Sequence, residues 1–348
     1  MISARPPRAG RNRTGAATVS TSVVRQATRR MMVFSGRWSA ALGQGIASHL
    51  GLDLGGLAIR TFPSGEIHVR YEESVRSADL FLVQSVASPV NDSLVELLLM
   101  IQAARLASAR HVTAVVPYYG YSRQDRKTTG REPISARLVA DLLEAAGADR
   151  ALSMDLHVGQ IQGFFRIPVD HVTAEPVLVD HVRMLRVAGA LPGPLTIASP
   201  DVGRAKLANR VAERLDAAPA VIAKRRAEPG RAAATLLIGE ARGRSVVLID
   251  DMIDTGATLI AAARTLRDAG AVRIMAMATH GIFSGGALER LGAEGFDEVV
   301  VTNTIPVPEP RPPWLTVLPV DEILAASIDA VFRDESVSAL FEGGNQPF

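Results

Sequence analysis

The 348-residue sequence contains no cysteine. This absence excludes disulfides, cysteine-ligated zinc sites, iron–sulfur clusters and a thiol nucleophile. Long apolar runs are missing as well: no stretch of about 18 apolar residues occurs, so we expect no transmembrane helix and no membrane partner. Hydrophobic residues nevertheless make up 47% of the chain, which is enough to form a folded core. These features predict a globular protein, which we expect in the cytoplasm.

Lysine is scarce, and acidic residues are missing from the N-terminal segment. The chain has 35 arginines but three lysines, Lys127, Lys206 and Lys224, so each lysine raises the question of what its compact ammonium does. Residues 1–33 contain seven arginines and no acid, whereas the remainder has 31 basic and 36 acidic residues, a net charge of −5. The basic charge therefore lies in a tail, residues 1–31, which we expect to be disordered. A folded basic face is not indicated, and nucleic acid is not an expected partner.

From about residue 33, short apolar strands alternate with amphipathic helices. The strands are continuously apolar, which is typical of parallel sheets covered on both faces. Two such series follow one another, and 348 residues are more than one hydrophobic core usually serves. We therefore predict two tandem doubly wound α/β domains with mainly parallel sheets, at residues 32–178 and 179–348. In such sheets ligands bind at the carboxyl ends of the strands, so polar residues that follow strands are the candidates for function.

The strongest candidate segment follows the predicted strand 246–249. Asp250 and Asp251 end this strand, and residues 254–258, Asp-Thr-Gly-Ala-Thr, open a helix. Free N–H groups at a helix start and loop hydroxyls can bind a phosphate. Adjacent carboxylates can accept hydrogen bonds from vicinal hydroxyls or hold magnesium through water. The pattern favours a sugar phosphate ligand over an ordinary Asp-rich turn.

Two further segments place polar residues after predicted strands. Residues 115–127 run from a strand into a loop with Arg123 and Gln124, where guanidinium groups can bind phosphate and stack on a purine. His157 and Asp201 follow two other strands and could ligate magnesium in a site that substrate phosphates complete. Taken singly, residues 115–127 are explained less well as a solvated basic loop than as a ligand site. A lone histidine such as His157, in contrast, is more often a hydrogen-bonded structural residue than a ligand, although its place at the end of a strand favours a ligand role.

Two weaker segments carry meaning in combination with the others. Residues 223–226 place Lys224 beside Arg225 and Arg226, and a cationic loop of this kind can close over a triphosphate. Residues 62–66 form a turn with an aromatic ring and a carboxylate. In isolation, the first segment is better explained as a solvated charge run, and the second is a weak signal.

Together the six segments resemble the ribose-phosphate diphosphokinase family, also called phosphoribosyl-diphosphate synthetases, from about residue 62 to residue 342 and in the family's order. Residues 250–258 resemble the phosphoribosyl-diphosphate-binding motif of the phosphoribosyltransferase fold. The resemblance implies two tandem phosphoribosyltransferase-type domains. It also implies transfer of the β,γ-diphosphoryl group of ATP to the 1-hydroxyl of ribose 5-phosphate, which gives phosphoribosyl diphosphate and AMP for nucleotide biosynthesis. The expected cofactor is Mg²⁺, and the expected assembly is a homo-oligomer of dimers forming a hexamer.

The resemblance also implies a role for each matching residue. Lys224 and Arg226 would be catalytic and would stabilise the migrating group. His157 and Asp201 would bind the metal. The residues expected to bind ATP are Phe62, Ser64, Gly65, Glu66, Arg123 and Gln124, and those expected to bind ribose 5-phosphate are Asp250, Asp251, Asp254, Thr255, Gly256, Ala257 and Thr258.

Two positions and one loop depart from the family's usual pattern. Ser64 stands where the family usually has Asp, so one contact to ATP is expected to be weaker or made differently. Arg204 stands where a second glycine is usual, and it would either add a phosphate contact or crowd the site. Residues 128–132 are shorter and less basic than the loop that serves regulation in other members, which puts inherited regulation in doubt.

Two other classes of function stay open at this stage. A non-catalytic, synthetase-like protein could modulate an active partner, although its catalytic cations and metal ligands would then be expected to be lost, and here they are present. A phosphoribosyltransferase acting on a base would account for residues 250–258 but would leave residues 123–125 and the paired domains unexplained. An assay for AMP release separates both from the synthetase.

Overall fold

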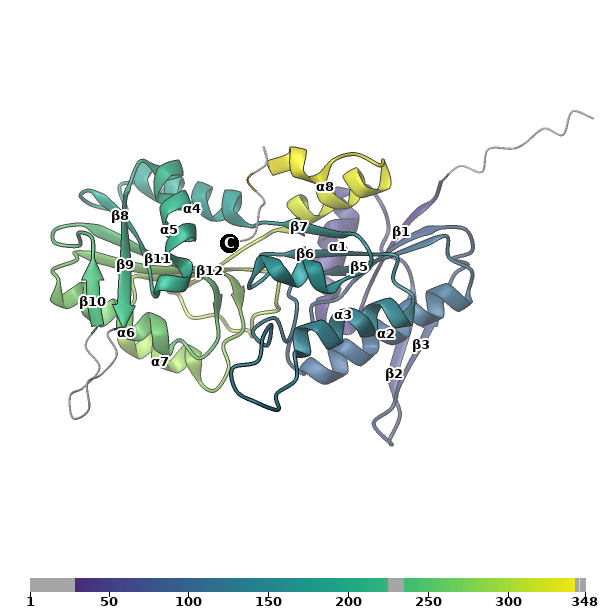
Figure 1. Ribbon diagram of the computed structural model, residues 1–348. Coiled ribbons are helices and arrows are strands. Elements are labelled where there is room, and N and C mark those ends of the chain that lie inside the picture. The colour runs from purple at the N-terminus through teal and green to yellow at the C-terminus, as the bar shows by residue number, and fades with distance from the viewer. Residues whose placement is uncertain (1–28, 225–234, 342–343, 345–348) are drawn as a thin grey trace, which may run out of the picture.

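The computed structural model describes residues 29–224, 235–341 and 344, and in these ranges the chain forms two α/β domains side by side (Figure 1). Each domain is built on its own sheet, one of five strands and one of seven. A separate two-stranded sheet projects from the N-terminal domain. Within these described ranges no helix is long and apolar enough to cross a membrane.

The N-terminal sheet is entirely parallel. Its strand order is β1-β4-β5-β6-β7, and the strands are β1 (Met31–Ser35), β4 (Asp79–Val83), β5 (His111–Val116), β6 (Arg150–Met154) and β7 (Val169–Val172). Along β4, Leu80 and Leu82 pack on one face while Phe81 and Val83 pack on the other. Both faces are therefore covered, which explains why the strand is apolar at every position rather than at alternate ones.

Different helices cover the two faces of this sheet. One face packs against α2 (Val90–Leu106) and α3 (Ser135–Ala146), and α3 ends at Gly147 in a left-handed conformation that glycine adopts without strain. The other face packs against α1 (Ala40–His49) and against two C-terminal elements, α8 (Asp321–Phe332) and the short 3-10 helix η4 (Val337–Phe341).

An antiparallel hairpin extends away from the N-terminal sheet. It consists of β2 (Leu57–Thr61) and β3 (Ile67–Tyr71), joined by the turn at residues 62–66. Its base is fixed by Tyr71, whose ring packs edge-on against Phe34 and whose hydroxyl donates a hydrogen bond to the Met100 carbonyl. The tip projects downward from the N-terminal domain and lies apart from the C-terminal domain (Figure 1).

The C-terminal sheet has the order β10-β9-β8-β11-β12-β13-β14. All its neighbours are parallel except β10, which is antiparallel to β9. The strands are β8 (Leu195–Ser199), β9 (Ala218–Lys224), β10 (Thr235–Ile238), β11 (Ser245–Ile253), β12 (Arg273–Gly281), β13 (Glu298–Thr302) and β14 (Leu315–Leu318). Helices α6 (Ala257–Asp268) and α7 (Ala287–Glu294) cover one face, and α4 (Glu175–Val187) and α5 (Ala205–Leu215) cover the other.

The predicted fold class, two tandem doubly wound domains with mainly parallel sheets, is confirmed. The domain limits differ in two places. Helix α8 and η4 lie in the range expected for the second domain, yet they pack on the N-terminal sheet against α1, because their apolar side chains complete that face. The ordered fold also begins before residue 32: Met31 opens β1, and Arg29 forms an ion pair with Asp79 at 3.1 Å.

Candidate functional site

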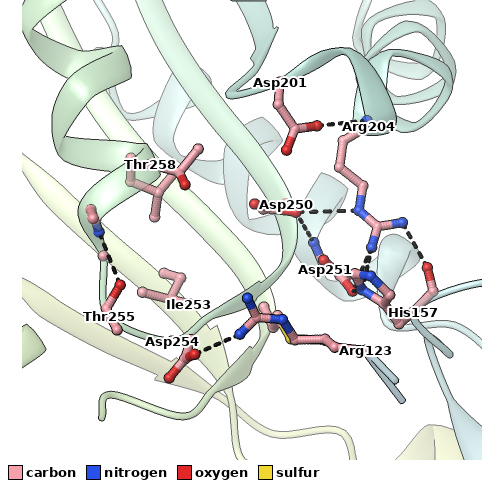
Figure 2. A pocket seen from close by; sticks show the side chains of 14 residues that line it. Arg123, His157, Asp201, Arg204, Asp250, Asp251, Ile253, Asp254, Thr255 and Thr258 are labelled. Atoms are coloured by element: carbon pink, nitrogen blue, oxygen red, sulfur yellow. Dashed lines mark hydrogen bonds and ion pairs between the residues drawn. The ribbon is translucent and has the colours of Figure 1, made fainter. Parts of the chain in front are cut away.

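A polar cavity of about 160 Å³ lies where the carboxyl ends of strands from both domains meet (Figure 2). The C-terminal domain contributes most of its wall, from the loop after β8 and from the end of β11 into the start of α6. The N-terminal domain contributes two side chains from the loops after β5 and β6. The lining residues are Arg123, His157, Asp201, Arg204 and residues 250–259. Ten predicted site residues, with roles in sugar-phosphate, metal and ATP binding, therefore line one cavity.

The acidic pair at the end of β11 is held by one arginine and one histidine, which form a cluster with it. Oδ2 of Asp251 lies 2.7 Å from Nη2 of Arg204 and 2.7 Å from Nδ1 of His157, while Oδ1 of Asp250 lies 3.3 Å from Nε of Arg204. Nδ1 of His157 is also 2.6 Å from Nη2 of Arg204, and it can donate to the carboxylate or accept from the guanidinium, but not both. The cluster joins the N-terminal domain to the C-terminal domain.

The two carboxylates have different environments. Burial raises the pKa of Asp250 well above its ordinary value, and the adjacent charge of Asp251 adds to this in spite of Arg204. Burial also acts to raise the pKa of Asp251, but the hydrogen bond with His157 and the charge of Arg204 outweigh it and lower the pKa to about 2. Asp251 is therefore the carboxyl group of the pair that ionises first as the pH rises. The Asp250 side chain is 16% exposed and that of Asp251 2%, so Asp250 is the one more accessible to a ligand.

The loop after the acidic pair has the geometry of an anion site. Gly256 has φ = 76° and immediately precedes α6, and residues 254–258 line the cavity. The unpaired N–H groups at the start of a helix favour an anion. The loop is fixed from outside by Arg290, whose Nη2 donates to the Thr255 carbonyl at 2.8 Å. Oγ1 of Thr255 accepts a long hydrogen bond of 3.5 Å from the Ala257 N–H.

Arg123 reaches this loop from the other domain. Its Nη1 forms a 2.6 Å ion pair with Oδ2 of Asp254, and the other carboxylate oxygen of Asp254 accepts a hydrogen bond from Ser284. Arg123 was predicted to bind ATP and Asp254 to bind the sugar phosphate, and the structure brings the two predicted subsites into contact. Ser284 was not among the predicted site residues.

Several predicted residues lie outside the cavity. The turn with Phe62, Ser64, Gly65 and Glu66 is at the tip of the β2–β3 hairpin, far from β11 (Figure 1). In this turn Ser64 donates a 2.7 Å hydrogen bond to Glu66, and Phe62 lies against His68 and the Arg60 guanidinium. Gln124 is exposed, and its amide oxygen accepts a hydrogen bond from Ser135 at 2.6 Å.

The predicted catalytic pair is described only in part. Lys224 is the last residue of β9, and its backbone pairs in register with Thr235 of β10. Arg226 lies outside the described residues. Strand β9 is parallel to β8, so Lys224 and Asp201 follow the same edge of the sheet.

The cavity offers donor atoms for a metal ion but not a complete set from the protein. His157 and Asp201 both line it, as predicted, and their nitrogen and oxygen atoms are ligands that divalent cations accept. Across residues 29–224 and 235–341, however, no three histidine or acidic side chains lie where they could hold one ion together. The magnesium site completed by substrate phosphates therefore stays a prediction.

A buried histidine connects the two domains beneath the cavity. His280, at the end of β12, is 1% exposed; its Nε2 lies 3.1 Å from the Met154 carbonyl and its Nδ1 3.0 Å from Oγ1 of Thr304. Close by, the Thr279 hydroxyl donates a 2.6 Å hydrogen bond to Asp155 across the same boundary. These bonds fix the loop after β6, which carries His157, against the C-terminal sheet.

We expect His280 to make the protein less stable in mild acid. Burial lowers its pKa below the ordinary 6.5, although Asp155 and Asp251 act in the opposite direction. At a pH between the two pKa values, the unfolded chain binds a proton at His280 that the folded chain does not bind. The free energy of unfolding therefore falls as the pH drops from about 6.5 to the pKa of His280 in the folded protein. Urea unfolding between pH 5 and 7.5 should show a shallower loss of stability with acid in His280→Asn than in the unmodified protein. Equal slopes would contradict this assignment.

Comparison with known proteins places this chain in one family of enzymes. A family model described as the N-terminal domain of ribose phosphate pyrophosphokinase matches residues 31–147, and a phosphoribosyl synthetase-associated domain model matches residues 198–342. The ribose-phosphate pyrophosphokinase of Synechococcus elongatus is 50% identical over 315 residues, covering 90% of this chain and 94% of that protein, and that of Bifidobacterium longum is 47% identical over 319 residues, covering 90% and 93%. The crystal structure of phosphoribosylpyrophosphate synthetase from Mycobacterium smegmatis superposes with a TM-score of 0.83 at 43% identity, covering 88% of this chain and all of that one. The chain thus belongs to the ribose-phosphate pyrophosphokinase family.

Proposed function

We propose that this chain transfers the β,γ-diphosphoryl group of ATP to the 1-hydroxyl of ribose 5-phosphate. The observation that carries the proposal is the single cavity that combines the residue 254–258 anion loop and the Asp250–Asp251 pair with Arg123 and His157 from the other domain. A phosphoribosyltransferase acting on a base would use the loop and the acidic pair, but it would give no role to Arg123. The product, phosphoribosyl diphosphate, would serve nucleotide biosynthesis.

Ribose 5-phosphate would bind along the end of β11. Its phosphate would accept hydrogen bonds from the N–H groups at the start of α6 and from the hydroxyls of Thr255 and Thr258. Its vicinal hydroxyls would donate to Asp250, the more accessible carboxylate. This position would direct the 1-hydroxyl toward the other domain, where Arg123 and His157 lie.

The triphosphate would lie between the domains. The bond that forms joins the 1-oxygen of ribose to the β-phosphorus, and the bond that breaks joins that phosphorus to the oxygen shared with the α-phosphate. AMP leaves, and the hydroxyl proton is released. Such transfers depend mainly on alignment and on neutralised charge, so we assign Arg123 to the phosphates and Lys224 and Arg226 to the migrating group.

We propose that the reaction requires Mg²⁺, with His157 and Asp201 contributing ligand atoms. When bound with the triphosphate, the ion would neutralise negative charge and hold the phosphates in one geometry. The support is the chemistry of the two side chains and their place in one cavity. Removal of divalent ions with EDTA should abolish turnover, and added Mg²⁺ should restore it.

The β2–β3 hairpin carries part of the predicted ATP site, but it does not line the cavity of its own chain. If Phe62 and Glu66 bind ATP, they must do so in the cavity of a second copy, since the hairpin lies apart from the cavity of its own chain and lines no part of it. We therefore propose a homo-oligomer in which dimers assemble into a hexamer, as expected from the sequence. Sedimentation velocity would measure its size, and Phe62→Ala should raise the KM for ATP without altering the fold.

The cytoplasmic location remains a prediction, which cell fractionation would test.

Replacement of Gly256 by alanine should weaken ribose 5-phosphate binding. A side chain at φ = 76° is strained by about 1–2 kcal/mol, and the new Cβ would lie 3.1 Å from Cδ2 of Leu291. Relaxation of the loop would move the N–H groups off the phosphate, so we expect the KM for ribose 5-phosphate to rise about tenfold and that for ATP to change little. Gly295→Ala is the matched control, because Gly295 has φ = 72° with open space around it and does not line the cavity.

The direct test of the proposed function is an AMP-release assay. Purified full-length protein with ATP, Mg²⁺ and ribose 5-phosphate should form equal amounts of AMP and phosphoribosyl diphosphate, and no AMP should form without the sugar phosphate. Absence of AMP would reject the proposal. If AMP appeared only with a copurified relative, the chain would be a modulator, and consumption of phosphoribosyl diphosphate by free bases would identify a phosphoribosyltransferase.

A further inference from the structure

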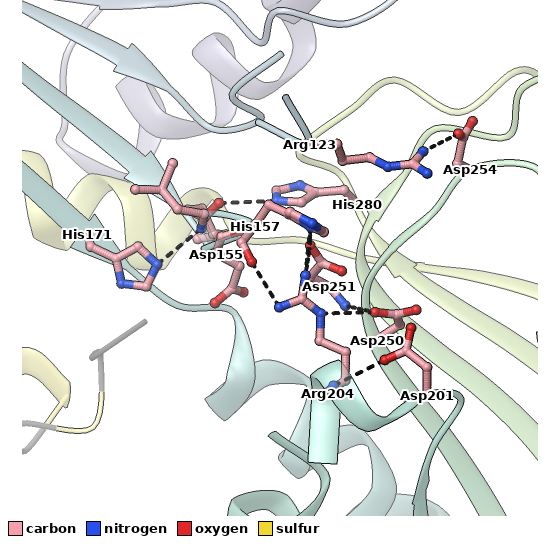
Figure 3. Close-up of polar contacts among 12 residues, drawn as sticks. Arg123, Asp155, His157, His171, Asp201, Arg204, Asp250, Asp251, Asp254 and His280 are labelled. Carbon is pink, nitrogen blue, oxygen red and sulfur yellow. Dashed lines mark hydrogen bonds and ion pairs between the residues drawn. The ribbon is translucent and has the colours of Figure 1, made fainter. Parts of the chain in front are cut away.

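Arg204 is a buried arginine in the centre of the cavity wall. It ends the short 3-10 helix η3 (Val202–Arg204) and precedes α5, and 6% of the residue is exposed. Its backbone N–H donates to Oδ1 of Asp201 at 3.3 Å, which fixes the start of its side chain. From there the side chain reaches across the cavity wall to the opposite domain (Figure 3).

The Arg204 guanidinium contacts three other residues of the site. Nη2 lies 2.7 Å from Oδ2 of Asp251, and Nε lies 3.3 Å from Oδ1 of Asp250. Nη1 donates to the His157 carbonyl at 2.9 Å. Arg204 thus touches the acidic pair and both residues expected to ligate a metal ion.

These contacts make Arg204 a counterion rather than a group free to bind substrate. A guanidinium stays charged at every relevant pH, and its planar fork can serve several acceptors at once. Each of its three nitrogens already has an acceptor within the protein. A divalent cation placed against His157 and Asp201 would meet this charge at close range with little water between them, because Arg204 contacts both residues and its side chain is 8% exposed.

We propose that Arg204 is the resident countercation of the Asp250–Asp251 pair and that it prevents a divalent cation from binding at His157 and Asp201 in the absence of substrate. A divalent ion then enters this part of the site only together with phosphate oxygens, which add negative charge and complete its ligands. That the ion binds together with substrate rests on the proposed function, whereas the exclusion of a free divalent ion by Arg204 does not. Arg204 acts in this way as a positioning residue that orders metal and substrate binding.

The experiment measures Mn²⁺ binding to the full-length protein without nucleotide or sugar phosphate, by electron paramagnetic resonance of the free ion. The unmodified protein should bind no Mn²⁺ at this site below the millimolar range. Arg204→Met removes the charge and keeps most of the apolar stem, and it should gain one Mn²⁺ per chain with at least tenfold tighter binding. Arg204→Lys keeps the charge and should behave like the unmodified protein. Arg210→Ala, which removes an ion pair between α5 and Glu175 of α4, should gain no site.

Each result decides for or against the proposal. A gain in Arg204→Met that the further change His157→Ala removes would support it. Micromolar Mn²⁺ binding by the unmodified protein that His157→Ala abolishes would overturn it without any need for a folded Arg204 variant. No gain in a folded Arg204→Met, with a raised KM for ATP, would show that Arg204 binds substrate phosphate instead. The AMP-release assay on the unmodified protein tests the proposed function separately, so the two can fail independently.

Discussion

Replacement of Lys224 by alanine is expected to lower the turnover of phosphoribosyl diphosphate formation by about 100- to 1000-fold, by analogy with the loss of one transition-state donor. Strand β9 ends at Lys224 and runs parallel to β8, with Val221 level with Ser199. The backbone therefore brings Lys224 to the sheet edge where Asp201 enters the cavity. A compact ammonium there can meet the charge that develops as the diphosphoryl group leaves AMP.

The division between kcat and KM distinguishes a transition-state role from simple binding. If Lys224 acts on the migrating group, kcat should fall while the KM for ATP changes by less than about threefold. Lys206→Ala is the matched control, because Lys206 is an exposed lysine of α5 that does not line the cavity, and it should retain full turnover. A raised KM with unchanged kcat in Lys224→Ala would place the lysine in ground-state binding.

Features that depend on neighbouring residues in the chain could be predicted from the sequence. The continuous apolar character of β4 and β11 indicated strands buried on both faces, and the structure packs alternate residues of each strand on opposite faces. Because parallel strands end at one edge, the polar residues after them could be expected to meet there. His157, Asp201 and Asp250 do share a cavity for this reason.

Features that depend on the path of the whole chain could not be predicted in this way. Local pattern does not reveal that α8 returns to the N-terminal sheet, because an amphipathic helix fits any apolar face of the right size. Nor does it reveal that the β2–β3 hairpin lies apart from the cavity and that Phe62 does not line it. Arg204 was noticed as a departure, but whether it adds a phosphate contact or crowds the site depends on where its side chain reaches, which only the arrangement of both domains determines.

Replacement of Asp251 by alanine is expected to destabilise the folded protein by about 3–5 kcal/mol, which is the usual loss when one partner of a buried ion pair is removed. The reason is the charge left behind: the Arg204 side chain is 8% exposed, and Asp251 is its shorter carboxylate contact. His157 would lose its carboxylate partner as well. Urea unfolding of the full chain near neutral pH would measure the loss, provided that both domains unfold in one transition.

The double variant Asp251→Ala with Arg204→Met tests whether the lost stability comes from the unpaired charge. If it does, the second change should restore part of what the first removed, because no guanidinium is then buried without its main partner. We expect the double variant to be more stable than the sum of the two single effects by at least about 1 kcal/mol. Additive losses would instead mean that Asp251 stabilises the fold through His157 and the backbone of β11, and that Arg204 is sufficiently satisfied by Asp250 and the His157 carbonyl.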